Sequence, residues 1–320
     1  MTASARTRSA GRVVVTGGAG FLGSHLVDRL VDEGYEVLVL DDLSSGKVSW
    51  LAASRRRGSV SVHKIDIRSA GLVDAVRRFS PALVFHLAAQ TSVAVAMKDP
   101  CHDADVNITG SLNVMEAAQV ARVERVVFAS TGGALYGRAA PLPAREGTSR
   151  RPDSPYGISK KVVEDYLDFW RRSRGLDYAV VRPANIYGPR QDPSGEAGVV
   201  AVFSRACLDR RRPTIFGSGK DTRDYVYVED VVDALMRASG KGGGAVYNIG
   251  TGVETSTQEV YDTIARHARF GGSPVYGPPR PGDIPRSVLD CGLAREELGW
   301  RPFTDFDDGI RRTVAWFADR

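Results

Sequence analysis

Short apolar runs, many of them β-branched, recur through the first half of the chain and alternate with stretches of helical periodicity. The runs predict buried strands at residues 13–16, 37–41, 60–65, 82–86, 125–129 and 178–182. Between most of them, the apolar spacing predicts helices at residues 21–33, 72–79, 102–121 and 156–174. This alternation is typical of a parallel sheet that helices cover on both faces.

The rhythm changes after Pro183, where segments rich in Gly and Pro separate weaker patterns. Helices are predicted at residues 199–208, 230–238 and 256–268, and one more strand at 245–249. The sequence therefore predicts an α/β protein with a doubly wound, Rossmann-like parallel sheet and a smaller, mixed α/β C-terminal substrate domain. We expect the first domain to span residues 1–182 and about 225–255, and the second to span 183–224 and 256–320.

The composition is that of an ordinary globular protein. Of the 320 residues, 42% are hydrophobic and 25% are charged, and no apolar run approaches the ~18 residues of a membrane span. The first residues are basic but lack the apolar stretch of a secretory signal. Three widely spaced cysteines, Cys101, Cys207 and Cys291, indicate neither a disulfide framework nor a metal site, so we expect a reducing cytoplasm and no bound metal.

A small excess of positive charge has two interpretations. The 43 basic residues outnumber the 38 acidic ones, for a net charge of +5. Basic runs at residues 55–57 and 210–212 come without any recognised nucleic-acid-binding pattern. We therefore expect no nucleic-acid partner. The charge is interpreted as a solvated face, or as a field that favours an anionic small ligand.

The first candidate site is a glycine-rich turn at the start of the chain. Gly17, Gly20 and Gly23 follow an apolar run and open a periodic helix. Glycines let such a turn close tightly and approach a pyrophosphate, whose charge the helix N-terminus stabilises. Asp41, at the end of the next strand, is placed to bind an adenosine ribose and to repel a 2′-phosphate. The pattern predicts an NAD site, and the alternative is a flexible loop with chance glycines.

The second candidate site is the pair Tyr156 and Lys160, the one Tyr-x-x-x-Lys spacing in the sequence. Residues four apart share a face of a helix. An ammonium beside a phenol favours the phenolate and lowers the tyrosine pKa from about 10 toward working pH, as a general base requires. The alternative is an ordinary pair on a surface helix.

Further segments complete a resemblance to a known family. Residues 128–137 hold Ser-Thr-Gly-Gly ahead of Tyr136 and Gly137, residues 86–90 are His-Leu-Ala-Ala-Gln, and residues 182–190 begin Arg-Pro-Ala-Asn. With the glycine turn and the Tyr–Lys pair, they resemble the extended short-chain dehydrogenase/reductase family, in its NAD-dependent nucleotide-sugar epimerase and dehydratase branch. The resemblance runs from about Arg12 to Trp300, nearly the whole chain.

The resemblance implies a catalytic set and a cofactor site. The catalytic residues would be Thr131, Tyr156 and Lys160, with Ser130 as the neighbour that could be mistaken for Thr131. The NAD-binding residues would be Gly17, Gly20, Phe21, Leu22, Gly23, Asp41, Asp42, Asp66, Ile67, Leu87, Ala88, Ala89, Gln90, Asn107, Tyr156 and Lys160.

It also implies a site for a nucleotide sugar. The residues would be Gln90, Thr131, Gly132, Gly133, Tyr156, Asn185, Val199, Phe216, Arg223, Tyr225, Arg280, Asp283 and Ser287. Arg223 and Arg280 would pair with phosphates, a task that suits the planar guanidinium. Phe216 would line the base, and Asp283 would accept a ribose hydroxyl.

The reaction that the family performs depends on the residues after Thr131. In the family, the tyrosine takes the proton of the sugar 4-hydroxyl while hydride passes to the nicotinamide. An epimerase then returns the hydride to the opposite face of the 4-keto sugar. Family dehydratases carry an Asp-Glu pair at this point, because elimination of water needs an added acid and base. Here the pair is Gly132 and Gly133, so we expect inversion of carbon 4 of a UDP-hexose.

Other outcomes stay open at this point. Within the family these are a 4,6-dehydratase, a 4-ketosugar reductase and a UDP-glucuronate 4-epimerase, whose carboxylate could meet Arg190 or Arg286. A non-catalytic NAD-sensing protein is the alternative from a different class. UDP-glucose and UDP-galactose are the default substrates. The family has a bulky residue at the position of Ser287 where N-acetyl sugars are excluded, so UDP-N-acetylglucosamine is also expected to fit.

The resemblance further implies a homodimer. In the family, the helices that correspond to residues 102–121 and 156–174 pack against their copies. Both stretches here carry apolar residues on more than one side, namely Val106, Leu112, Val114 and Val120, and Val162, Leu167, Phe169 and Trp170. A monomer with well-covered helices is the alternative.

Overall fold

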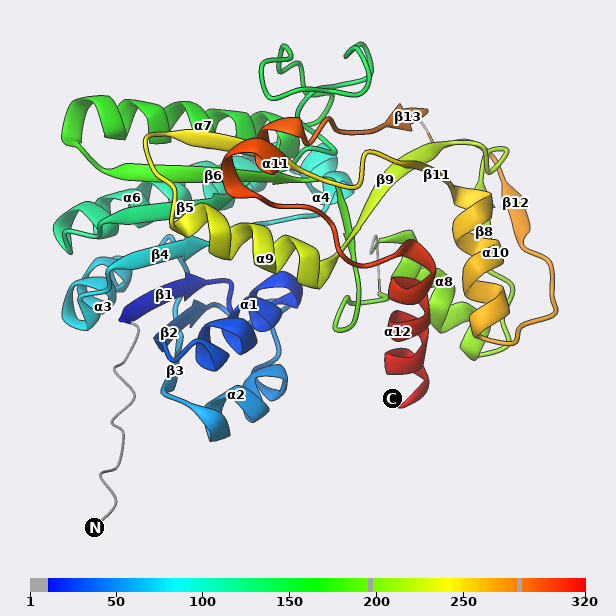
Figure 1. The fold of residues 1–320 in the computed structure, drawn as a ribbon, viewed down its shortest axis with the longest axis horizontal. Helices are drawn as coiled ribbons and strands as arrows, with labels where there is room; N and C mark the ends of the chain where they lie inside the picture. Colours follow the sequence, from blue (N-terminus) through cyan, green and yellow to red (C-terminus); the bar gives the residue numbers. More distant parts are fainter. Residues whose placement is uncertain (1–10, 195–197, 281–283) are drawn as a thin grey trace.

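Seven parallel strands form the central sheet of the protein (Figure 1). The computed structural model describes residues 11–194, 198–280 and 284–320. Neighbours in the sheet are all parallel, in the order β3-β2-β1-β4-β5-β6-β10. The strands are β1 (Arg12–Thr16), β2 (Glu36–Asp41), β3 (Val60–Lys64), β4 (Leu83–His86), β5 (Arg125–Ala129), β6 (Asp177–Pro183) and β10 (Ala245–Ile249). The predicted doubly wound α/β fold is confirmed.

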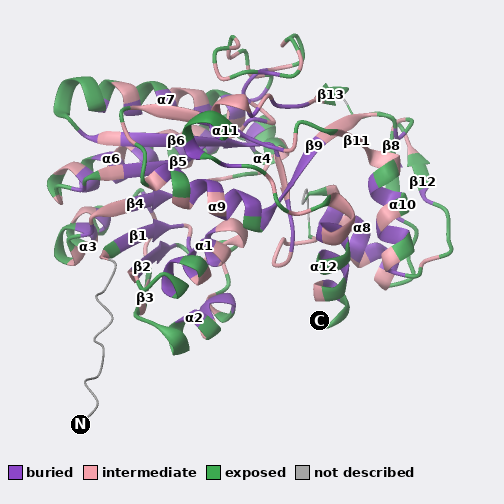
Figure 2. Cartoon of the chain, viewed as in Figure 1, coloured by how far each residue is buried: buried purple, intermediate pink, exposed green. Residues whose placement is uncertain are grey.

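Alternate residues of the strands enter two different hydrophobic cores. Val13 and Val15 of β1 belong to one core and Val14 to the other, and all three are fully buried. The helices over the first core are α1 (Phe21–Asp32), α9 (Val228–Ser239) and α11 (Gly292–Leu298), and those over the second are α3 (Gly71–Phe79), α6 (Gly110–Val120) and α7 (Pro155–Arg174). Figure 2 shows the buried strands between helices with exposed outer faces. Burial on both faces explains the continuous apolar runs in the sequence.

The strand order reverses between β1 and β4, which pair although β2 and β3 lie between them in sequence. In doubly wound folds, ligands bind in the crevice outside the carboxyl ends of the strands at such a point. The glycine turn follows β1, residues 87–90 follow β4, and residues 130–133 follow β5. The fold thus brings three predicted site segments together at the carboxyl ends of the central strands.

One predicted helix is broken. Residues 102–121 were expected to form a single helix, but the structure has α5 (Pro100–Ala104), a π-helical turn η2 (Asp105–Thr109) and then α6. A π-turn inserts an extra residue into a helix and is often found at functional sites. Three short elements were not predicted, namely the 3₁₀ turn η1 (Val48–Leu51), α2 (Ala52–Arg57) and α4 (Val93–Lys98).

A second set of elements lies beyond the end of β6. Three short strands, β7 (Asn185–Tyr187), β11 (Glu254–Ser256) and β13 (Arg286–Ser287), pair with β9 (Thr222–Tyr227). A separate pair is β8 (Thr214–Phe216) with β12 (Val275–Gly277). A third hydrophobic cluster joins these strands to α8 (Val199–Leu208), α10 (Thr257–His267) and α12 (Phe306–Ala318). The helices predicted near 199–208, 230–238 and 256–268 are confirmed, whereas α11, α12 and the short strands were not predicted.

The chain returns to the first core twice between elements of this second set. The predicted strand at 245–249 is β10, which adds to the central sheet beside β6. Trp300 was assigned to the second domain, yet its side chain is fully buried in the core over β1. The division of the chain into two domains stays a prediction.

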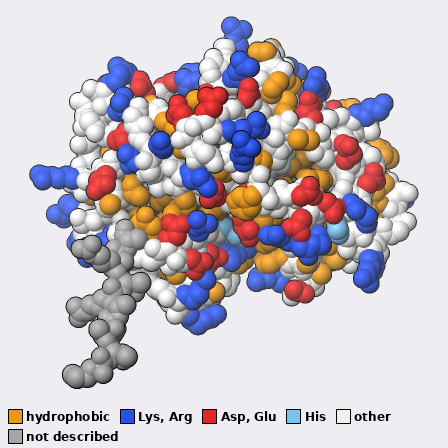
Figure 3. All heavy atoms as spheres, in the orientation of Figure 1, with side chains coloured by type: hydrophobic (Ala, Val, Ile, Leu, Met, Phe, Trp, Pro, Cys, Tyr) orange, Lys and Arg blue, Asp and Glu red, His pale blue; other side chains and the backbone are white. Residues whose placement is uncertain are grey.

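Charges of both signs mix on the surface. On the face in Figure 3, Lys and Arg side chains alternate with Asp and Glu. Arg57 of the first basic run pairs with Asp32 at 2.8 Å, and Arg210 and Arg212 of the second donate to backbone carbonyls. These contacts favour a solvated face as the explanation of the basic runs. Among the described residues, no helix combines the length and the apolar character needed to cross a membrane.

Candidate active site

The glycine turn between β1 and α1 is closed by contacts that leave no space for side chains. A Cβ on Gly23 would lie 2.1 Å from the carbonyl oxygen of Gly17, and one on Gly17 would lie 2.7 Å from the backbone nitrogen of Ala88. Gly17 also has a φ of +69°, which disfavours other residues. Gly20 is the N-cap of α1 and offers no side chain to its first turn, Phe21 to Gly23, which contains no acidic residue. The free N–H groups of that turn fit an anionic pyrophosphate.

Asp41 has a structural role that the sequence did not reveal. Its side chain is buried, and its two oxygens accept the backbone N–H groups of Ala19 and Leu43, both at 2.9 Å. Burial raises the pKa of Asp41, and these two hydrogen bonds oppose the shift. The carboxylate, at the end of β2, therefore holds the glycine turn in place through its hydrogen bond with Ala19. Asp42 is exposed and accepts the backbone N–H and hydroxyl of Ser44.

The acidic residue after β3 is already paired. The Asp66 carboxylate lies 2.6 Å from the guanidinium of Arg68, whose hydrogen bonds lower the pKa of Asp66. Ile67 is buried in the core against Gly110. The Ile67 carbonyl accepts the Asn113 side chain at 2.6 Å, so at this residue the backbone N–H is left for contact with a ligand.

The segment after β4 is held by a buried chain of hydrogen bonds. The Thr16 hydroxyl accepts the N–H groups of Leu87 (3.2 Å) and Ala88 (3.3 Å), and it lies 2.8 Å from Nδ1 of His86. Burial and the charge of Lys160 lower the pKa of His86 to about 3, so the ring is neutral. Ala89 and Gln90 continue this half-buried segment at the edge of the sheet.

Gln90 and Asn107 are committed to each other and to Asp103. Asn107 accepts the backbone N–H of Gln90 and donates to its carbonyl, each at 2.9 Å. The Gln90 side chain donates to Asp103 and to the carbonyl of Ser92. Because the backbone N–H and both amide hydrogens of Gln90 are used within the protein, only the remaining acceptor capacity of its carbonyl oxygens is left for a ligand.

The proposed catalytic pair lies in the first turns of α7. Ser154 caps the helix by accepting the N–H of Gly157, which fixes where the helix begins. Lys160 is buried, and its Nζ donates to the carbonyl of Ala129 at 2.8 Å. The same ammonium lies 5.9 Å from the centre of the Tyr156 ring. The Tyr156 hydroxyl has no hydrogen-bond partner among the residues that the structure describes, so it is available to a ligand.

Burial moves both members of the pair away from their charged forms. It lowers the pKa of Lys160 to about 8, while the charges of Asp103 and Glu164 oppose this shift. It raises the pKa of Tyr156, and Asp103 raises it further. The expected fall of the Tyr156 pKa is therefore absent in the chain alone, because loss of hydration and the charge of Asp103 both raise this pKa. The chain by itself keeps Tyr156 as a phenol.

The structure distinguishes Thr131 from its neighbour Ser130. Ser130 is buried, and its hydroxyl donates to Glu164 at 2.6 Å. Glu164 also accepts Arg182 at 2.6 Å and Arg150 at 2.8 Å. Thr131 is half-buried, and its hydroxyl has no partner in the described part of the chain. The geometry thus leaves Thr131 as the hydroxyl available to a substrate oxygen.

Gly132 and Gly133 serve different purposes. A Cβ on Gly132 would lie 2.4 Å from the Leu289 side chain, so a larger residue there requires Leu289 to move. A Cβ on Gly133 would meet the Asn185 amide oxygen at 3.4 Å. The Leu289 side chain thus occupies the space beside Gly132. Neither position supplies an acid.

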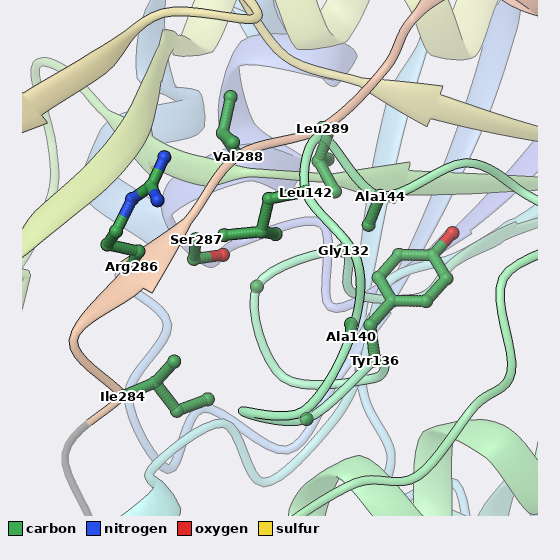
Figure 4. Close-up of a pocket in the computed structure, with 12 residues that line it drawn as sticks. Gly132, Tyr136, Ala140, Leu142, Ala144, Ile284, Arg286, Ser287, Val288 and Leu289 are labelled. Atoms are coloured by element: carbon green, nitrogen blue, oxygen red, sulfur yellow. The ribbon is translucent and has the colours of Figure 1, made fainter.

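Several of the predicted substrate residues gather on the small sheet around β9. Asn185 of β7 pairs with Tyr225, and Ser287 of β13 pairs with Arg223. Figure 4 shows Ser287 facing the loop that begins at Gly132, across a pocket that Leu142 and Tyr136 also line. The residues that line this pocket come from two distant parts of the sequence.

The remaining predicted substrate residues lie farther along the same region. Val199 begins α8, and the guanidinium of Arg280 stacks over the Phe216 ring, 4.0 Å from its centre. Arg223 donates to the carbonyl of its neighbour Thr222 at 2.8 Å. Asp283 lies outside the described residues.

Three buried residues that the sequence did not single out organise this site, namely Asp103, Glu164 and Arg182. Asp103 and Glu164 have a signal in the sequence, whereas Arg182 lies on strand β6 and has none of this kind. Asp103 stands four residues before Asn107, and Glu164 stands four residues after Lys160, so each shares a helix face with a predicted site residue. A charged residue on the apolar face of a helix is the pattern that marks them.

Comparisons with known proteins agree with this geometry. The model of the NAD dependent epimerase/dehydratase family matches residues 13–250. A UDP-glucose 4-epimerase of Mycolicibacterium smegmatis is 48% identical over 310 residues, which is 97% of this chain and 99% of the relative. The crystal structure of the Thermotoga maritima UDP-glucose 4-epimerase with UDP-glucose is 44% identical with a TM-score of 0.93, over 96% of this chain and 99% of that one. The Thermus thermophilus UDP-glucose 4-epimerase in complex with NAD is also 44% identical, with a TM-score of 0.88 over 96% and 98%.

The glycine turn allows a test of the dinucleotide site. Gly23→Ala forces the turn apart, because the new Cβ would overlap the Gly17 carbonyl. We expect affinity for NAD, measured by calorimetry, to fall about tenfold or more, since a rigid backbone contact cannot relax without strain. Gly147→Ala is the control, because nothing lies within 4 Å of its added Cβ. Equal NAD affinity in the two variants would contradict the assignment of the turn.

Proposed function

The chain belongs to the NAD dependent epimerase/dehydratase family, and we propose that it inverts carbon 4 of a UDP-hexose, with UDP-glucose and UDP-galactose as its substrates. The observation that carries the proposal is the arrangement around β5. Tyr156 and Thr131 offer hydroxyls that have no partner within residues 11–194, 198–280 and 284–320, beside a buried Lys160, and Gly132 and Gly133 supply no acid. The named relatives with 44–48% identity support the same activity.

The residues of the turn and of β4 fit NAD. The uncapped first turn of α1 and the closely packed glycines would hold the pyrophosphate, and Lys160 and Tyr156 would face the nicotinamide end. Bound NAD supplies a hydride acceptor and donor, so the substrate passes through a transient 4-keto sugar while the cofactor ends unchanged.

The chain's own residues handle the proton. Tyr156 takes the proton of the sugar 4-hydroxyl and returns it to the ketone oxygen. Lys160, held by the Ala129 carbonyl, keeps a positive charge near the tyrosine ring and stabilises the phenolate form of Tyr156 that accepts this proton. Thr131 donates to the same sugar oxygen and holds it in line for the transfer.

Elimination of water fits this site poorly. A dehydratase needs an added acid and base next to the sugar. The nearest acidic residue along this loop is Glu146, whose carboxylate accepts the backbone N–H of Asn248 at 2.9 Å. The residues that follow Thr131 are small and neutral, which favours return of the same hydride over elimination.

A sugar acid is also disfavoured as the substrate. The two arginines that could have met a carboxylate already have carboxylate partners. Arg190 lies 2.7 Å from Asp28, and Arg286 makes two contacts with Glu254, at 2.5 and 2.9 Å. A neutral sugar leaves these ion pairs intact, so UDP-hexoses are preferred to UDP-glucuronate.

The three cysteines are consistent with a reducing compartment. Cys207 and Cys291 are buried thiols, Cys101 is exposed, and all three are free. We therefore place the enzyme in the cytoplasm.

Removal of the tyrosine hydroxyl tests the mechanism. In Tyr156→Phe we expect kcat for UDP-glucose to fall about 100-fold or more, because the proton acceptor is lost, while bound NAD is retained. Tyr35→Phe, next to the start of β2, is a matched control that should keep full activity. Sugar interconversion is followed by NMR and NADH by absorbance. Full activity of Tyr156→Phe would refute the mechanism, and stoichiometric loss of NADH would identify a reductase.

The size of Ser287 tests the sugar specificity. Ser287→Tyr narrows the pocket beside Gly132 (Figure 4), so turnover of UDP-N-acetylglucosamine should fall at least tenfold relative to UDP-glucose, as expected when a bulky group no longer fits. The exposed Ser59→Tyr is the control. An unchanged ratio of the two turnovers would show that Ser287 does not set the specificity.

We further propose that the enzyme is a homodimer through α4 and α7. Phe169 is 45% exposed, Ile158 is 49% exposed and Met97 is 61% exposed, which is unusual for a set of large apolar side chains. A shallow pocket on α7 is lined by Val162, Tyr166 and Phe169. Part of the sequence argument was wrong, because Val114, Leu167 and Trp170 are buried in the protein's own core.

A charge placed on this face tests the dimer. We expect Phe169→Glu to give a monomer in size-exclusion chromatography with light scattering, because a carboxylate would be buried without a partner. Phe303→Glu introduces the same charge at another exposed phenylalanine, and it should leave the mass unchanged. A dimeric Phe169→Glu protein would place the interface elsewhere, and a monomeric wild type would refute the dimer.

A further inference from the structure

Asp103 is a fully buried carboxylate beside the proposed catalytic helix. One oxygen accepts the side-chain amides of Gln90 and Asn107, both at 2.9 Å, and the other accepts the Ser159 hydroxyl at 2.7 Å. Among the described residues no cation lies within ion-pair distance of it. Burial of a carboxylate without a cation costs free energy, because the charge loses its hydration. The three hydrogen bonds compensate for part of this loss.

The three donors come from three separate parts of the site. Gln90 follows β4, Asn107 lies in the π-turn η2, and Ser159 lies in α7 immediately before Lys160. On α7, residues 156, 159 and 160 share one face. A single carboxylate therefore connects the turn that carries Tyr156 and Lys160 with the segment that lines the cofactor crevice.

We infer that Asp103 is a positioning residue of the proposed epimerisation: it fixes Ser159 on α7 against the end of β4 and sets a buried negative charge beside Tyr156 and Lys160. The inference rests on the proposed function for the identity of the reaction. The contacts themselves do not depend on it.

The charge of Asp103 acts on both members of the pair in the same direction. It raises the pKa of Tyr156 and it raises the pKa of Lys160, against the lowering by burial. The other titratable groups that face Lys160 are Glu164 of α7, which also raises its pKa, and the neutral His86 of β4. Loss of the Asp103 charge should therefore let Tyr156 ionise at lower pH and let Lys160 lose its proton at lower pH.

Asp103→Asn removes the negative charge of the side chain but keeps its shape. The amide oxygen can still accept Gln90 and Asn107, and the amide nitrogen can donate to Ser159, so all three hydrogen bonds survive. We expect the variant to keep its melting temperature and its bound NAD. Both limbs of the plot of kcat against pH should move to lower pH, because they report the essential base and acid of the bound complex.

Ser159→Ala is the complementary variant, because it keeps the charge and removes one connection. We expect kcat to fall about tenfold with an unchanged KM and with both pH limbs in place, which is less than the roughly 100-fold that a 1 Å displacement costs. It also keeps the inference testable if Asp103→Asn does not fold. An unchanged kcat in Ser159→Ala would overturn the positioning role.

A second readout does not require activity. The ultraviolet absorbance of tyrosinate is titrated in wild type and in Asp103→Asn, each with Tyr156→Phe added as the blank. The step that belongs to Tyr156 should appear at lower pH in Asp103→Asn. Unmoved pH limbs together with an unmoved tyrosinate step would overturn the inference. If the wild type fails to interconvert UDP-hexoses but the step still shifts, the proposed function fails and the role of Asp103 stands.

Discussion

The buried ion pair between Arg182 and Glu164 is the interaction on which the arrangement of the site depends. Both side chains are only 4% exposed, and they lie 2.6 Å apart. Arg182 stands near the end of β6, Glu164 stands one turn beyond Lys160 on α7, and Ser130 at the end of β5 donates to the same carboxylate. A buried pair adds little net stability, but loss of one partner costs about 3–5 kcal/mol, because the other charge is left without compensation. The pair therefore fixes the relative position of two strands and the catalytic helix.

The same network of hydrogen bonds extends to Tyr136, which lines the pocket in Figure 4. Arg182 donates to the Tyr136 hydroxyl, which donates to Asn248 of β10 at 2.6 Å, and the backbone N–H of Asn248 donates to Glu146. The loop that starts at Thr131 is thus tied to the far edge of the sheet at several points. Side chains held in this way are already oriented before a ligand arrives, which is what transfer of a proton within a narrow geometry requires.

A second buried chain connects the glycine turn to the helix with the π-turn. The Ser111 hydroxyl donates to the Asn107 carbonyl, so it accepts the Nε2 hydrogen of His86, and Nδ1 of the same ring accepts from Thr16. The ring is neutral, because burial and the charge of Lys160 lower its pKa to about 3. The protein thus places one protonated lysine, and not a second cation, beside the proposed tyrosine base.

Local patterns in the sequence determined the parallel sheet, the helices around it and the dinucleotide turn, because the spacing of apolar residues and glycines reflects constraints within a few residues. The Tyr156–Lys160 pair belongs to the same class, since four residues always make one turn of a helix. Contacts between distant segments decided the rest. They bonded Ser130 to Glu164 and left the Thr131 hydroxyl without a partner among the described residues. They made Asp41 an acceptor for the backbone of the glycine turn and packed Leu289 against Gly132. They also raised the pKa of Tyr156 where the sequence predicted a fall, because burial is a property of the packed fold and not of the motif.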